Sequence, residues 1–260
     1  MYRFKFLLLA ILFISKSVFS QTADQKNQQL YNYAVKLQQD GKFDDALTVF
    51  KNLLKSDSSN VAYLHHAAFL YAKSGFNQPT EKIKTSFFNI AEYLSLKAIA
   101  INPKSADAHY TYALTVAGKN EFASNRSKIE NARLIKTEAE TAIRLNPKLA
   151  GPYHVLGRWH QALAGFNSFE RGMIKAIFGG LPGGSYDDAI KNFEMAILLE
   201  PLNGLHYYQL AISYHLRDHE GDNNQAINWL KKGILIQIRN DGEIKSQKDM
   251  EDLLKKLSSK

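Results

Sequence analysis

One short pattern occurs three times in this chain and constrains its fold more than any other feature. Residues 96–103, 140–147 and 194–201 each place an alanine five residues before a proline. The alanine lets a neighbouring helix approach closely. The proline ends the helix, because it lacks an N–H donor and clashes with the preceding turn. The three copies predict a chain built from repeated helix pairs, stacked one on the next.

The rest of the chain has the same organisation. Apolar residues recur with the helical period, and no stretch alternates for long as a strand would. The Gly-Lys-Phe-Asp-Asp-Ala run at 41–46 is mirrored by Gly-Gly-Ser-Tyr-Asp-Asp-Ala at 183–189. Each first helix carries one small residue that should face its partner helix. These residues are Ala34, Ala68, Ala113, Gly157 and Ala211.

The repeat divides the chain into five units and a final helix. The first unit is the shortest, and the second to fourth carry insertions of about 11, 10 and 20 residues. An amphipathic segment at 243–257 is expected to cover the exposed end of the stack as a capping helix. The units are residues 27–60, 61–105, 106–149, 150–203 and 204–240, and all belong to one repeat domain, 21–260.

These residues resemble the tetratricopeptide repeat family, whose unit has a small residue in its first helix, a Gly-x-[Tyr/Phe] turn and a terminal proline. The resemblance implies an all-α, right-handed superhelical solenoid of about five tetratricopeptide-like helix pairs. The resemblance is specific for the fold and implies little about chemistry.

The fourth unit carries a narrower resemblance. Leu156-Gly-Arg-Trp-His160, the segment 169–179 and Ala189-Ile-Lys-Asn-Phe193 are similar to the regulator of microtubule dynamics family. That family has a Leu-Gly-Arg-Trp helix followed by a long insertion, and its eukaryotic members associate with microtubules or organelle membranes. The resemblance implies the fold and the Arg158-Trp159 element, and Trp159 is expected in the core.

The pattern of residues 1–20 predicts a secretory signal peptide. Arg3 and Lys5 precede an apolar run at 6–14, and Val18-Phe19-Ser20 places small residues at the positions before a cut at Gln21. The run is shorter than the ~20 residues of a membrane-spanning helix, which favours cleavage over an uncleaved anchor. We therefore expect an exported bacterial protein in the periplasm or extracellular space, where there is no tubulin.

The amino-acid composition excludes several classes of chemistry and of partner. The absence of cysteine excludes disulfides, thiol catalysis and cysteine-ligated metals. The net charge of +8 falls to +5 once Arg3, Lys5 and Lys16 are removed with the leader, and the remaining charges are dispersed. Lys231-Lys232 and Lys255-Lys256 are only short pairs, so we expect no nucleic-acid partner.

Aromatic and histidine side chains recur at one position of the repeat. The fifth residue of every unit is a tyrosine or histidine, and Arg158 lies one helical turn after the fourth of them. Flat rings with polar tips suit the binding of an extended peptide, and an arginine can bind a carboxylate through two N–H donors. Alternatively the rings pack between adjacent first helices, and Arg158 pairs with Glu170. The predicted partner-binding groove comprises Tyr31, His65, Tyr110, His154, Arg158 and Tyr208.

Other candidate sites are weaker. His215 and His219 are four residues apart, but 217–224 resembles a turn and should leave His219 outside the helix, so we expect no metal or cofactor there. Ser185 is expected to cap a helix rather than act as a nucleophile.

The inserted segment 166–178 has an apolar stripe. This stripe could contact a membrane surface or a partner helix, and we expect it instead to fold back and become buried against the stack.

The resulting prediction is a non-enzymatic module in the cell envelope that binds a peptide or protein segment. Two alternatives are a membrane-anchored adaptor of the microtubule-regulator type and a helical, metal-dependent hydrolase that uses histidines.

Overall fold

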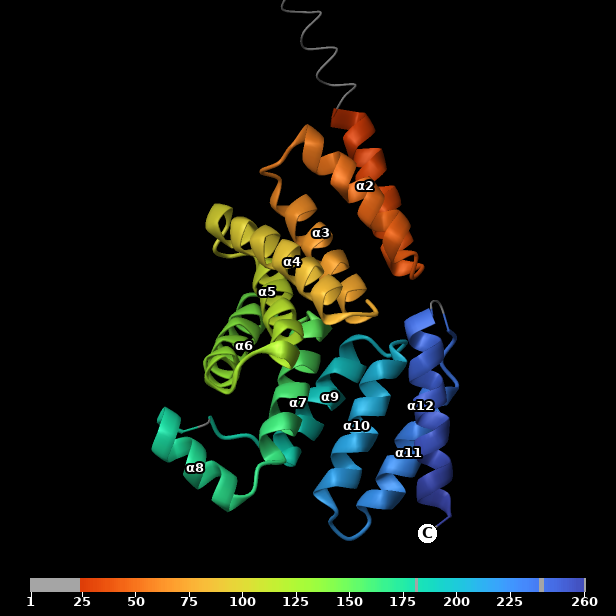
Figure 1. The fold of residues 1–260 in the computed structure, drawn as a ribbon. Helices are drawn as coiled ribbons and strands as arrows, with labels where there is room; N and C mark the ends of the chain where they lie inside the picture. Colours follow the sequence, from red (N-terminus) through yellow and green to blue (C-terminus); the bar gives the residue numbers. More distant parts are fainter. Residues whose placement is uncertain (1–23, 181, 239–240, 260) are drawn as a thin grey trace, which may run out of the picture.

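The computed structural model describes residues 24–180, 182–238 and 241–259, so the predicted leader lies outside the described residues. Within these ranges the regular structure is entirely helical, and successive helices form antiparallel pairs (Figure 1). We call the first helix of each pair helix A and the second helix B. The pairs are residues 24–39 with α2 (Phe43–Ser56), α3 (Val61–Phe76) with α4 (Glu81–Ile101), α5 (Ala106–Lys119) with α6 (Asn125–Leu145), α7 (Ala150–Ala164) with α9 (Tyr186–Leu199), and α10 (Gly204–Arg217) with α11 (Asp222–Ile234).

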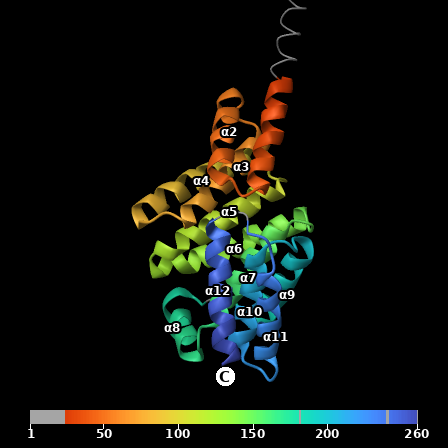
Figure 2. The same ribbon diagram turned by 90° about the vertical axis from the view of Figure 1, so that its right-hand side faces the viewer.

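The pairs stack into a solenoid, which confirms the predicted fold class. Each A helix contacts its own B helix and the next A helix along the chain, as α3 contacts α4 and α5. Figure 2 shows the chain passing along the stack from the N-terminal pair to the C-terminal helices. The hydrophobic core therefore continues from pair to pair, as expected for repeats that cannot bury their apolar faces alone.

The repeated alanine–proline pattern ends three B helices in the same way. The backbone N–H groups of Asn102, Asn146 and Glu200 each donate to the carbonyl of the patterned alanine at 2.9 Å, and the proline follows directly. All three alanines are fully buried, which leaves room for the neighbouring helix. They are Ala98, Ala142 and Ala196.

Side chains also fix where helices begin. Ser185 accepts a hydrogen bond from the Asp188 N–H at 3.1 Å, so it caps α9 as predicted. The same Ncap arrangement satisfies backbone donors that have no partner within the helix. It is made by Asn60, Thr80, Ser105, Ser124, Asn167 and Asn203.

The predicted small residues of the A helices lie where helices meet. Ala34, Ala68, Ala113 and Ala211 have no exposed surface, and Gly157 is buried. At Gly157 an added Cβ would lie 2.6 Å from the Phe193 ring of α9, so only glycine admits this ring. Phe193 itself is fully buried.

The C-terminal helix, α12 (Asp241–Ser258), covers the last pair. It packs on α10 and α11 through Met250 and Leu257, which are almost completely buried. This agrees with the capping role expected for 243–257.

The inserted segment of the fourth unit corrects a prediction. It forms α8 (Ser168–Phe178) between α7 and α9, and α8 projects from the edge of the stack in both views (Figures 1 and 2). Phe169 and Ile177 are 75% and 65% exposed, so the expected burial of the stripe is wrong. Capping at Asn167 and the left-handed Gly179 direct the helix away from the core instead.

No helix among the described residues is both long enough and apolar enough to cross a lipid bilayer.

The contact between Gly157 and Phe193 gives a test of the packing. Gly157→Ala should lower the free energy of unfolding by about 1–3 kcal/mol, because the methyl group overpacks a rigid junction. Urea denaturation would measure this. Gly172→Ala in α8 is the matched control: no heavy atom lies within 4 Å of its added Cβ. That variant should be neutral or more stable by up to ~1 kcal/mol. Equal destabilisation by the two substitutions would contradict the close approach.

Candidate functional site

All five predicted ring residues lie on A helices, and all five are half-buried. Tyr31 is in helix 24–39, His65 in α3, Tyr110 in α5, His154 in α7 and Tyr208 in α10. We call the surface that carries them the A-helix face. Several of their contacts join one A helix to the next, so the rings contribute to the stacking as well as to this face.

At the N-terminal end, the contact of Tyr31 is with His66 rather than with His65. The Tyr31 Oη lies 3.3 Å from His66 Nε2, and His66 Nδ1 lies 2.9 Å from Gln38 Oε1. The His66 ring also stacks on Phe50, with ring centroids 4.7 Å apart. The sequence did not indicate which of the adjacent residues His65 and His66 would contact helix 24–39.

In the middle of the stack, Tyr110 fits against a glycine of the next A helix. An added Cβ at Gly151 would lie 2.2 Å from the Tyr110 Cζ, so the ring occupies the place of a side chain on α7. Phe69 of α3 lies on its other side, with centroids 6.1 Å apart. Burial raises the pKa of Tyr110, and the charges of Glu200 and Asp107 raise it further.

Further along, two imidazoles and a carboxylate lie in series. His154 Nδ1 is 2.8 Å from His206 Nδ1, and His206 Nε2 is 3.0 Å from a Glu200 carboxylate oxygen. Burial holds the pKa of His154 well below its usual value, and the neighbouring His206 and Arg158 lower it further. His154 is therefore neutral near pH 7, which makes this end of the face less cationic than its composition suggests.

Arg158 is exposed and is held by an amide rather than by a carboxylate. Its Nη1 donates to the Gln209 Oε1 at 2.6 Å, and the Gln209 backbone carbonyl accepts from Gln161 Nε2 at 2.8 Å. The alternative pairing with Glu170 is absent, because that carboxylate accepts from the Asn167 N–H in the α8 capping box. Arg158 has no acidic partner among the residues that the structure describes.

The residues around Arg158 in the Leu-Gly-Arg-Trp element are used in packing. Leu156 and Trp159 are only 6% and 5% exposed, and the Trp159 indole N–H donates to the Ala132 carbonyl at 2.7 Å. The Phe193 ring occupies the space beside Gly157 that a side chain would otherwise take. Trp159 is thus a core residue, as predicted, and Arg158 alone of the four directs its polar group away from the core.

At the C-terminal end, α12 lies against Tyr208. The Tyr208 ring packs beside Met250, and burial together with Asp249 and Asp252 of α12 raises its pKa. Tyr208 is therefore a junction between α10 and the capping helix.

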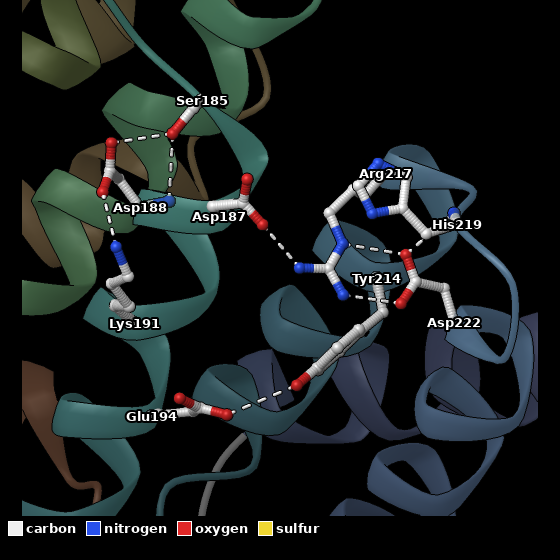
Figure 3. A network of polar contacts seen from close by, with 9 residues as sticks. All are labelled: Ser185, Asp187, Asp188, Lys191, Glu194, Tyr214, Arg217, His219 and Asp222. Carbon is white, nitrogen blue, oxygen red and sulfur yellow. Dashed lines mark hydrogen bonds and ion pairs between the residues drawn. The ribbon is translucent and has the colours of Figure 1, made fainter.

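Of the candidate histidine pair, His219 lies in a different polar cluster (Figure 3), whereas His215 Nδ1 lies 3.0 Å from Asn223 Oδ1. α10 ends at Arg217, so His219 is outside the helix as predicted, and its N–H donates to Asp222 at 3.0 Å. Arg217 donates to Asp187 and to Asp222, both at 2.6 Å, and so joins α9 to the start of α11. Throughout the described ranges no three His, Asp or Glu side chains converge as metal ligands.

Comparison with known proteins settles the family. The model of the family "Regulator of microtubule dynamics protein 1-3" matches residues 30–258. The chain belongs to this family.

Its curated relatives include regulator of microtubule dynamics protein 1 of Bos taurus, 28% identical over 180 residues, which are 69% of this chain and 56% of the bovine protein. Protein 2 of Homo sapiens is 27% identical over 175 residues, 67% of this chain and 42% of the human protein. The chain thus spans about half the length of these relatives.

A solved structure of another protein has a similar fold. A thermophilic TPR protein from Thermus thermophilus superposes with a TM-score of 0.62 at 18% identity, covering 90% of this chain and all of that one. At this identity the likeness establishes the tetratricopeptide-type fold alone.

Neutral buried histidines predict acid sensitivity. Burial lowers the pKa of His65 to about 4. The unfolded chain therefore binds the proton first, and stability present above about pH 6.5 is lost as pH falls toward 4. At about pH 5, His65 should contribute a loss of about 2 kcal/mol to the free energy of unfolding.

Urea denaturation near neutral pH and near pH 5 would measure this loss. His65→Gln should lose less stability on acidification than the parent protein, whereas His219→Gln, at an exposed position, should follow the parent. An unchanged pH dependence in His65→Gln would contradict the assignment.

Proposed function

We propose that the protein is a non-enzymatic interaction module that binds an extended segment of a partner protein along the A-helix face. The tetratricopeptide-type fold supports a scaffold for protein partners. The observation that carries the proposal is Arg158, an exposed cation in the second half of the stack that a buried amide orients and no described acid neutralises.

The chemistry favours an acidic group on the partner. One Arg158 N–H is engaged by Gln209, which leaves the other donors of the guanidinium to bind a carboxylate. The Gln209 side chain is buried, so it orients the guanidinium before a partner arrives. Preorganisation of this kind lowers the conformational cost of binding.

The neighbouring rings would supply the remaining contacts. Tyr110 and His154 keep part of their surface accessible while the helices behind them are fixed. Rings held in this way contribute apolar contact area at little entropic cost. His65 and Tyr31 extend the same kind of surface toward the N-terminal pair.

We further propose that the protein acts in the cell envelope after residues 1–20 are removed. The support is the charged leader, the short apolar run at 6–14 and the small residues before Gln21. The mammalian relatives are named for regulating microtubule dynamics. Export would separate this chain from microtubules, so the proposal transfers only their scaffold role.

Loss of the Arg158 charge should weaken partner binding. Arg158→Gln should reduce recovery of bound proteins in affinity capture from the cell-envelope fraction by about tenfold or more, since a charged hydrogen bond contributes about 1.5–3 kcal/mol. Quantitative mass spectrometry would measure the recovery. Arg144→Gln is the matched control, because Arg144 is exposed on α6 and, among the described residues, bonds only to Thr141. Equal recovery with both variants, at unchanged melting temperature, would refute the role of Arg158.

Removal of the leader can be tested directly. Intact mass of the protein isolated from its native host should correspond to a chain that begins at Gln21. A mass that retains residues 1–20 would contradict cleavage and would favour the alternative of a membrane-anchored adaptor.

A further inference from the structure

The projecting helix α8 presents a row of apolar side chains to solvent. Phe169, Met173 and Ile177 of α8 recur at helical spacing and are 75%, 49% and 65% exposed, and Phe166, just before the helix, is 37% exposed. We call this row the α8 stripe. Contiguous exposed apolar surface of this kind marks an interaction site more often than scattered single residues do.

The helix that carries the stripe is firmly held. The Asn167–Glu170 capping box fixes its start, and the Arg171 guanidinium donates to the Leu163 and Phe166 carbonyls. Beyond its end, Arg133 of α6 donates to the Gly180 carbonyl at 3.0 Å. The stripe is therefore exposed on a helix anchored at both ends.

Cationic side chains surround the stripe. Lys175 lies on α8, and Arg126 and Arg133 of α6 line a cavity of about 560 Å³ together with Ile177. The two acids nearby are already engaged, since Glu130 pairs with Arg126 at 3.2 Å and Glu170 completes the capping box. Because Glu130 neutralises Arg126, the cations that make this region complementary to an anionic surface are Arg133 and Lys175.

We propose that α8 docks in the plane of an anionic membrane surface. Phe169, Met173 and Ile177 enter the boundary between headgroups and acyl chains, while Arg133 and Lys175 remain at the level of the lipid phosphates. An amphipathic helix with apolar side chains on one face and basic residues beside it has this mode of binding.

The size of the stripe favours a lipid surface over a protein partner. α8 has 11 residues and is about 16 Å long. A stable protein interface usually needs about 800 Å² from each partner, which four side chains do not supply. Lipid binding needs only a few inserted side chains together with electrostatic attraction.

The absence of cysteine in the chain allows a site-specific test with the full-length protein. Met173→Cys would carry an environment-sensitive fluorophore on the stripe. Tyr93→Cys, at a 65% exposed aromatic on α4, is the matched control. Both are mixed with vesicles of phosphatidylcholine alone or of phosphatidylcholine with phosphatidylglycerol.

A blue shift and quenching by brominated lipid are expected only at position 173 and only on the anionic vesicles, weakening as salt is added. Phe169→Ala combined with Ile177→Ala should lower vesicle association by about tenfold or more, whereas Tyr93→Ala should not change it. The apolar run at 6–14 is common to all variants, so a difference between them reports α8.

Three results would overturn the proposal: no shift at position 173, equal shifts at both positions, or a shift that appears without vesicles and grows with protein concentration. The last would assign the stripe to a second copy of the chain. Because these residues are exposed, their substitution leaves the core intact, which circular dichroism would verify.

Discussion

The solenoid depends on helices that approach one another closely at alanine and glycine residues. Phe88 and Phe193 are fully buried because glycines of the A helices leave room for their rings. An added Cβ at Gly118 would lie 2.4 Å from the Phe88 ring, and one at Gly157 would lie 2.6 Å from the Phe193 ring. These contacts bring α5 close to α4 and α7 close to α9.

The rings of the A-helix face help to join consecutive helices. Tyr110 fills the space above Gly151, and His154 faces His206, so each ring helps to join consecutive helices. Tyr110 and His154 are both half-buried, so each residue keeps part of its surface accessible. Because burial keeps His154 uncharged, Arg158 is the cation available to an acidic group beside it.

The sequence predicted that the inserted segment would be helical, but it did not predict where that helix would lie. Helical spacing alone showed that 166–178 forms an amphipathic helix, and it does so. Burial of the stripe depended on which side chains and backbone groups of α6 and α7 lie near it. There Arg126 and Arg133 of α6 line a cavity with Ile177, and Arg171 of α8 donates to the Leu163 and Phe166 carbonyls, while Phe169 and Ile177 are exposed.

The sequence by itself determined the helix pairs, because the patterned alanine and the proline act within five residues of one another and a small residue recurs in each first helix. It also placed Tyr31, His65, Tyr110, His154 and Tyr208 on one side of the A helices, since helical spacing is local. Only the tertiary structure decided which groups these residues meet: His66 for Tyr31, His206 for His154 and Gln209 for Arg158. Those contacts join residues about 35 to 50 positions apart, and their geometry depends on how closely whole helices pack.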